Sequence, residues 1–149
     1  MNEPWSLHPR LAADTVAVGD FGLSRLLLSN DANYPWLILV PRRAGIREIH
    51  ELDEADQLQL LRESMLLSRA LTSAFAPTKL NLATLGNMVP QLHVHHIARF
   101  ETDPAWPAPV WGKVPAIDYD PAARDATIAK LRAVLGTALI ADGKANIVP

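Results

Sequence analysis

The sequence predicts an α+β fold, with an antiparallel sheet that carries one long helix on a face and a second helix near the C-terminus. Three observations predict it. Short extended runs follow each other closely up to residue 41, helical spacing of apolar residues covers 53–75, and another helical pattern covers about 121–136. A chain of 149 residues suits one domain and is too short for two of ordinary size, so we expect a single domain over residues 1–149.

Composition narrows the class of protein. Hydrophobic residues make up 49% and charged residues 20%, which is typical of a globular chain. The net charge of -2 and the lack of a lysine and arginine block argue against a nucleic-acid polymer as partner. The chain has no cysteine, which excludes a thiol nucleophile and fits a reducing compartment. The N-terminal residues lack a signal-peptide pattern and no apolar run could span a bilayer, so we expect a cytoplasmic protein with no membrane partner.

The first half of the sheet is predicted by alternation and turn residues. Residues 15–20 alternate and end in turn residues, and 25–28 continue in extended style, which indicates a hairpin. A polar loop at 29–35 precedes the apolar run 36–40, which stops at Pro41. This run is typical of a central strand.

A long helix with a broad apolar face is predicted from Asp53, a suitable N-cap, to about Phe75. Pro77 ends it. The apolar face is expected to include one set of residues at helical spacing and a second set beside it: Leu58, Leu61 and Met65, then Leu60, Leu67 and Leu71.

Extended structure is expected to resume at 80–83, to be interrupted at Gly86, and to return in a strand over 89–99. The proline-rich segment 103–115 is too apolar for a linker, so we expect an ordered loop packed on the domain. We favour a lid over the core for its tryptophans, with a contribution to a pocket or to a dimer contact as the alternative. The final helix is expected to bury Ile128, Leu131 and Leu135.

Three of the five histidines lie within residues 93–96. On a strand, successive side chains point to opposite faces. One face would then carry Gln91, His93, His95, Ile97 and Arg99, and the other would carry Leu92, Val94, His96 and Ala98. The first face is polar and the second mostly apolar, which favours a sheet with a helix on the second face and a ligand on the first.

The histidine pair suggests phosphorus chemistry. A neutral imidazole can attack phosphorus and hold the transferred group on nitrogen, and a second imidazole two residues away can donate a hydrogen bond to a phosphate oxygen. Two alternatives remain: His93 and His95 are surface residues, or they are two ligands of a metal ion, although their strand has no carboxylate to complete the set. His96 is expected in the core, hydrogen-bonded through its ring.

The run from Gln91 to Arg99 resembles the H-x-H-x-H-x-x signature of the histidine-triad (HIT) family of nucleotide hydrolases and transferases. The preceding Gly86-Asn87-Met88-Val89 is similar to that family's Gly-Gln-Ser/Thr-Val segment, and Ser29-Asn30 resembles its nucleoside-side loop. The resemblance covers about residues 10–112. It implies a HIT-like sheet of about five strands with the long helix on one face, and a homodimer.

The resemblance implies that His93 is the nucleophile and that His95 contacts the phosphate. Gln91 replaces the first histidine of the signature; it can form hydrogen bonds but cannot be protonated. The catalytic residues would be His93, His95 and Gln91. The nucleotide-binding residues would be Asn30, Gly86, Asn87, Met88, Val89 and Arg99. For three of these an ordinary structural role is the alternative: a turn cap at Asn30, a turn glycine at Gly86 and a salt-bridged arginine at Arg99.

The implied activity is hydrolysis or transfer of a nucleotidyl group through a nucleotidyl-histidine intermediate, without a metal or other cofactor. The substrate would be a nucleotidyl phosphoester, a phosphoramidate or a dinucleoside polyphosphate. Met88 stands where the family usually has a hydroxyl, and a thioether is a poor replacement. Gln91 and Met88 therefore motivate an alternative, a nucleotide-binding protein with low turnover, beside the metal-binding protein that would use His93 and His95.

Overall fold

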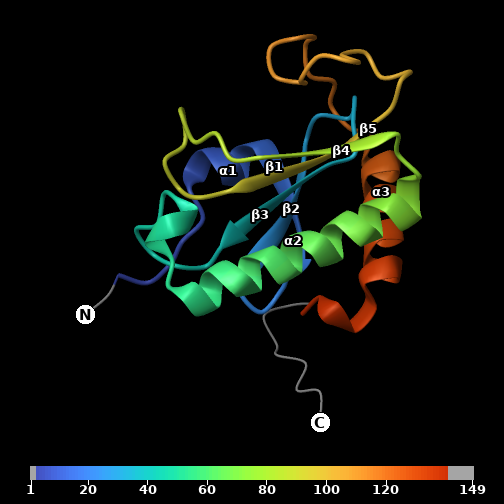
Figure 1. The fold of residues 1–149 in the computed structure, drawn as a ribbon. Helices are drawn as coiled ribbons and strands as arrows, with labels where there is room; N and C mark the ends of the chain where they lie inside the picture. Colours follow the sequence, from blue (N-terminus) through green and yellow to red (C-terminus); the bar gives the residue numbers. More distant parts are fainter. Residues whose placement is uncertain (1–2, 141–149) are drawn as a thin grey trace.

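The computed structural model describes residues 3–140 and contains one antiparallel sheet with the strand order β1-β2-β3-β5-β4 (Figure 1). The predicted α+β fold with about five strands is confirmed. The strands are β1 (Thr15–Asp20), β2 (Ser24–Ser29), β3 (Trp36–Pro41), β4 (Lys79–Ala83) and β5 (Val94–Arg99). The helices are α1 (Pro9–Asp14), α2 (Glu54–Phe75) and α3 (Pro121–Leu135), with 3-10 turns η1 (Ile49–Glu51) and η2 (Gly136–Ala138). Residues 1–2 and 141–149 of the expected domain lie outside the described residues.

The predicted hairpin and central strand are both present. β1 and β2 pair with Thr15 opposite Ser29, and the register shifts between Ala17 and Gly19. β3 lies between β2 and β5, with Leu37 paired to His96. This central position explains why almost all of β3 is buried.

α2 covers one face of the sheet and buries a narrower stripe than the sequence predicts. Asp53 caps it, because its Oδ1 accepts from the backbone N–H of Asp56 (2.8 Å). Leu60, Leu67 and Leu71 enter the core as expected. Leu58, Leu61 and Met65 do not: they are 49%, 57% and 37% exposed. With about 100° between successive residues, they lie on another side of the helix, and a single sheet covers only one stripe.

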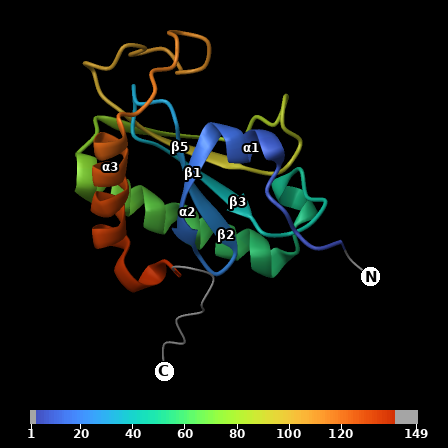
Figure 2. The same cartoon turned by 180° about the vertical axis from the view of Figure 1, so that it is seen from behind.

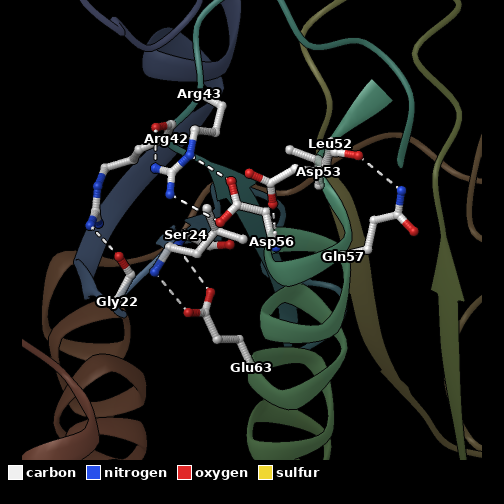
Figure 3. A network of polar contacts seen from close by, with 10 residues as sticks. Gly22, Ser24, Arg42, Arg43, Leu52, Asp53, Asp56, Gln57 and Glu63 are labelled. Carbon is white, nitrogen blue, oxygen red and sulfur yellow. Dashed lines mark hydrogen bonds and ion pairs between the residues drawn. The ribbon is translucent and has the colours of Figure 1, made fainter. Parts of the chain in front are cut away.

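The first turns of α2 are tied to the sheet by polar contacts (Figure 3). Arg43, just after β3, donates to both carboxylate oxygens of Asp56 at 2.6 and 3.0 Å. The buried carboxylate of Glu63 accepts from the backbone N–H groups of Leu23 (2.8 Å) and Ser24 (2.9 Å). These bonds satisfy a buried charge with donors at the start of β2, so they set the position of the helix on the sheet.

β5 is shorter than predicted, beginning at Val94 instead of residue 89. Its ladder with β4 ends at Ala83 opposite His95, and its ladder with β3 ends at Leu39 opposite Val94. Residues 89–93 therefore have no strand partner. The backbone N–H of Leu92 donates instead to the carbonyl of Ile46 (2.9 Å).

The predicted alternation of faces nevertheless continues through this irregular segment. Leu92 and Val94 lie in the core under α2. Ile97 lies on the other face, packed with Tyr34 and with Val110 of the 103–115 loop. The predicted packing of that loop on the domain is thus confirmed.

The opposite face of the sheet is partly covered by α1 and the segment before it (Figure 2). Leu11 of α1 packs with Leu27, Ile38 and Val40 of the sheet and with Val89. This second, smaller core leaves the rest of the face open for a cavity.

α3 packs against α2 and the main core (Figures 1 and 2). The three residues predicted to be buried, Ile128, Leu131 and Leu135, are buried. Arg132 donates from Nε and Nη2 to the carbonyl of Val18 in β1 (3.0 and 2.8 Å). Within residues 3–140, none of the helices combines the length and the apolar character needed to cross a membrane.

Candidate functional site

A cavity of about 410 Å³ lies on the α1 face of the sheet, within the size range of small-molecule sites. His93 and His95 both line it, as predicted. The other lining residues come from α1 and the start of β1, from β2 and β3, from the segment before β5 and from the 103–115 loop: Arg10, Leu11, Asp14, Thr15, Ser29, Trp36, Ile38, Leu85, Gly86, Asn87, Met88, Val89 and Trp111.

His93 is held by a bond that decides its tautomer. Its Nδ1 lies 2.6 Å from the backbone carbonyl oxygen of Gln91. A carbonyl can only accept, so Nδ1 carries a proton, and in the neutral form of the ring the lone pair is on Nε2. The side chain is nearly buried. His93 therefore lines the cavity with Nε2 as the ring nitrogen that is not bonded to Gln91.

His95 is held in the opposite tautomer. The indole Nε1–H of Trp36 donates to His95 Nδ1 at 2.9 Å, which leaves the proton of the neutral ring on Nε2. Burial, with smaller contributions from the neighbouring His93 and His96, lowers the pKa of His95 to about 3. His95 is thus a neutral hydrogen-bond donor at neutral pH. Its ring centroid lies 4.9 Å from that of His93.

The segment before β5 forms one side of the cavity, and the four predicted contacts Gly86, Asn87, Met88 and Val89 all line it. Gly86 has φ +74°, a conformation that L side chains rarely adopt. Met88 is 73% exposed, so its thioether lies at the rim. The segment can therefore offer backbone and amide groups to a ligand, with an apolar edge.

Gln91, expected in the catalytic set, is directed to the N-terminal segment and not into the cavity. Its Oε1 accepts from the backbone N–H of His8 (2.9 Å), and its Nε2 donates to the carbonyl of Ser6 (2.8 Å). Gln91 is thus on the α1 side of the sheet, as the alternation predicts, but the N-terminal segment occupies both polar atoms of its amide. Gln91 anchors the segment that leads into α1 and the cavity wall.

Arg99 lies outside the cavity, in a buried network that matches the salt-bridge alternative. Its guanidinium donates to both carboxylate oxygens of Asp103 (2.8 and 3.1 Å) and to Asn81 Oδ1 (2.8 Å). Burial would raise the pKa of Asp103, but the bonds from Arg99 and from three backbone N–H groups outweigh it and lower the pKa to about 2. Arg99 is only 1% exposed, so it is not placed to meet a phosphate.

Asn30 also lies outside the lining set. Its Nδ2 donates to the carbonyl of Ala13 (3.2 Å), and its backbone N–H donates to the carbonyl of Asp14 (3.0 Å). The neighbouring Ser29 lines the cavity in its place. The contact between Asn30 and a ribose stays a prediction.

Several lining residues were not predicted from the sequence. Trp36 and Ile38 alternate along β3, a signal that would place them together once the ligand face of the sheet is known. Arg10 and Asp14 lie on a six-residue helix with no detectable apolar period. Trp111 was expected mainly as part of a lid; it packs on the rings of Trp36 and His95.

His96 is in the core, as predicted. It is fully buried, its Nδ1 donates to the carbonyl of Val94 (3.0 Å) and its Nε2 lies 2.6 Å from Ser64 Oγ. Burial lowers the pKa of His96 to about 4, although the bond to Val94 acts in the other direction. Among residues 3–140, no group of three or more histidine, cysteine, aspartate or glutamate side chains is placed to hold a metal ion.

Comparisons with known proteins identify the family and the fold of this chain. Residues 10–102 match the HIT domain family. A histidine triad protein from Bradyrhizobium japonicum has 51% identity to this chain and a TM-score of 0.87, with 88% of this chain and 98% of the other covered. One from Marinobacter aquaeolei has 51% identity and a TM-score of 0.87, with 89% and 97% covered.

A third, from Sinorhizobium meliloti, has 43% identity and a TM-score of 0.86, with 88% of this chain and 97% of the other covered. The search of curated proteins found no match. The family match covers more than half of the chain and includes both cavity histidines. The chain therefore belongs to the histidine triad family, whose fold it shares.

Proposed function

We propose that this protein is a nucleotide-binding hydrolase or transferase that forms a nucleotidyl-histidine intermediate on His93. The observation that carries the proposal is the pair of opposite tautomers. His93 presents the Nε2 lone pair, while the adjacent His95 presents an Nε2–H. A nucleophile beside a neutral donor suits attack at phosphorus, where negative charge develops on the phosphate oxygens.

The reaction would occur in two steps. In the first, His93 Nε2 bonds to the α-phosphorus while the bond from phosphorus to the leaving group breaks, and the leaving group takes a proton from solvent. His95 donates from Nε2 to a non-bridging oxygen. In the second step, water attacks phosphorus and gives a proton to solvent, the N–P bond breaks with its electron pair returning to His93 Nε2, and a nucleoside monophosphate is released. Another acceptor in place of water would make the reaction a transfer.

The charges of the cavity favour substrates with one phosphate. Among the lining residues, Arg10 is the single cation, and its Nε lies 3.8 Å from Asp14 Oδ2. A polyphosphate carries several negative charges, and these need more cations than the cavity supplies. The cavity also has apolar, partly exposed lining residues, namely Leu85, Met88 and Trp111. A nucleotidyl phosphoester or phosphoramidate with an apolar leaving group therefore fits better than a dinucleoside polyphosphate.

The nucleophile assignment is tested by release of nucleoside monophosphate from adenosine phosphoramidates and dinucleoside polyphosphates. We expect the wild type to release it, and His93→Ala to lose at least about 1000-fold in kcat. His50→Ala, at an exposed histidine outside the cavity, is the control and keeps wild-type release. Equal release by wild type and His93→Ala would contradict the assignment.

A nucleotide-binding protein with low turnover is the second candidate. It is favoured by the placement of Gln91 outside the cavity and of Met88 at its rim. Nucleoside monophosphate binding measured by calorimetry, together with no His93-dependent release, would support this candidate over the first.

We also propose a homodimer that uses one exposed apolar surface. This surface consists of Leu58, Leu61 and Met65 of α2, with Ile49 and Leu82. Leu82 is on β4, an edge strand of the sheet, and a groove joins it to Leu60 and Leu61 of α2. A second copy would cover apolar area and an open strand edge together.

The proposed dimer is tested by sedimentation. Leu61→Lys should shift the protein to the monomer, because the surface would then bury an unpaired charge. Ile117→Lys is the matched control, at an equally exposed apolar residue outside the surface. A monomeric wild type would contradict the proposal. The single domain over residues 1–149 and the cytoplasmic location stay predictions.

A further inference from the structure

The contact between Trp36 and His95 joins two residues that are 59 positions apart in the sequence. Trp36 begins β3, where it pairs with Ile97 of β5, two residues beyond His95. Its ring meets His95 edge to face, with centroids 5.6 Å apart and an interplanar angle of 63°. An indole nitrogen can only donate, so the 2.9 Å contact requires an acceptor at His95 Nδ1.

The indole itself has little freedom to move. Trp111 packs on Trp36 at 5.6 Å and on His95 at 5.1 Å, with interplanar angles of 88° and 79°. Tyr34, which is 2% exposed, meets Trp36 from another side at 6.3 Å. Trp36 is therefore a donor fixed by packing, and its direction does not depend on a ligand.

We propose that Trp36 is a positioning residue, whose indole N–H holds His95 in the tautomer that presents Nε2–H to the phosphate. The catalytic consequence rests on the proposed function of the site, whereas the tautomer does not. Since Nδ1 is occupied by the indole, the ring can donate only through Nε2.

The alternative tautomer would oppose the reaction. With the proton on Nδ1, the indole N–H would face a ring N–H, and the Nε2 lone pair would face the phosphate oxygen. Both contacts are repulsive, and the developing charge would lose its donor. The same argument applies to metal binding, because His95 could offer a lone pair at Nε2 only by breaking the bond from Trp36.

The test compares the wild type with a variant in which 3-benzothienylalanine replaces Trp36. That side chain keeps the bicyclic shape and has sulfur where the indole has N–H. Long-range ¹⁵N–¹H correlation spectra of histidine-labelled protein report the tautomer of His95, and a coupling across the N–H···N bond reports the contact directly. Trp36→Phe is a second variant that removes the donor by ordinary mutagenesis, and Trp111→Phe controls for lost aromatic packing in the tautomer measurement alone.

We expect the wild type to show Nε2–H at His95 and a coupling to Trp36 Nε1. In both Trp36 variants we expect the Nδ1–H tautomer to become populated and kcat to fall about 10-fold or more, with KM within about 3-fold of wild type. Trp111→Phe should keep the wild-type tautomer.

Three outcomes would overturn the inference: a proton on His95 Nδ1 in the wild type, a kcat in the benzothienylalanine variant equal to wild type, or a lower kcat with an unchanged tautomer. If the wild type has no His93-dependent turnover, the proposed function fails. The tautomer spectra then still decide whether Trp36 controls His95.

Discussion

His95 and His96 are neighbours on β5 that point to opposite faces of the sheet, and comparing them separates a histidine of the cavity from a histidine of the core. Both are buried, and burial lowers the pKa of each, to about 3 for His95 and about 4 for His96. The difference is in the ring nitrogens. His96 uses both, on Val94 and Ser64, whereas His95 uses Nδ1 on Trp36 and lines the cavity. Burial and pKa therefore do not distinguish the cavity histidine from the core histidine; a ring nitrogen without a partner among residues 3–140 does.

The largest expected effect is on kcat, and it comes from replacing His95, the histidine that lines the cavity. His95→Ala removes a donor to the developing charge, so we expect kcat for nucleoside monophosphate release to fall about 100-fold to 1000-fold. The free energy of unfolding, measured with urea, should change less than in His96→Ala. A kcat close to that of the wild type would show that His95 does not act on the phosphate.

Replacing His96, the histidine in the core, should lower the free energy of unfolding. His96→Ala leaves a cavity at a fully buried position and removes the partner of Ser64. We expect a loss of about 2–4 kcal/mol in the free energy of unfolding, measured by urea titration. The folded fraction should keep the wild-type kcat within about 3-fold, since His96 does not line the cavity. A selective loss of kcat with full stability would reverse the two assignments.

The two histidines should also make stability depend on pH. Each has a folded pKa below the ordinary value of about 6.5, so the unfolded chain binds more protons as the pH falls below that value. Their contribution to stability is fully present above about pH 6.5. It is lost as the pH falls toward about 4 for His96 and toward about 3 for His95. Each adds a slope of at most about 1.4 kcal/mol per pH unit.

Urea unfolding at several values between about pH 7.5 and 5 measures this slope. His96→Gln retains an amide near Ser64 but does not titrate, so the slope should fall to roughly half that of the wild type. A stability that stays constant over this interval would contradict both pKa shifts.

The smallest expected effect concerns Gln91, whose amide lies outside the cavity. Gln91→Ala removes the two bonds to Ser6 and His8, which lead into the α1 wall. We expect KM to rise about 3-fold to 10-fold while kcat changes by less than about 2-fold, because the bond from His93 goes to the backbone carbonyl of residue 91. Gln57→Ala, which removes an amide donor to Leu52 at the start of α2, is the control. A large fall in kcat would favour a direct catalytic role for Gln91.

Local patterns in the sequence predicted most of the fold. The turn residues, the cap at Asp53 and the prolines act within a few residues, so the bounds of β1, β3 and α2 agree closely with the prediction. The start of β5 was missed because a strand ends where its neighbours end, and those neighbours are distant in sequence. The wrong face assigned to Leu58, Leu61 and Met65 has a similar cause, because α2 has apolar residues on two sides and the sheet buries one.

The candidate site was predictable to the extent that it depends on alternation. His93 and His95 line the cavity and His96 faces the core because a strand separates adjacent side chains. Gly86 to Val89 also line the cavity as expected. By strand alternation Arg99 belongs to the same face as His93 and His95. In the structure, however, it forms an ion pair with Asp103, four residues later, and does not line the cavity. Strand alternation predicts the face of the sheet on which a side chain lies, but it does not predict which residue a charged side chain will bind.

The sequence by itself thus determined the α+β class, the long helix and the division of the histidines between two faces, because periodicity and turn chemistry act over short distances. Only the tertiary structure decided which nitrogen of His95 is available, where Gln91 points and which residues complete the cavity. These depend on contacts such as Trp36 with His95 and His8 with Gln91, 59 and 83 positions apart. The order of strands in the sheet and the docking of α1 bring those residues together, and no local pattern encodes that order.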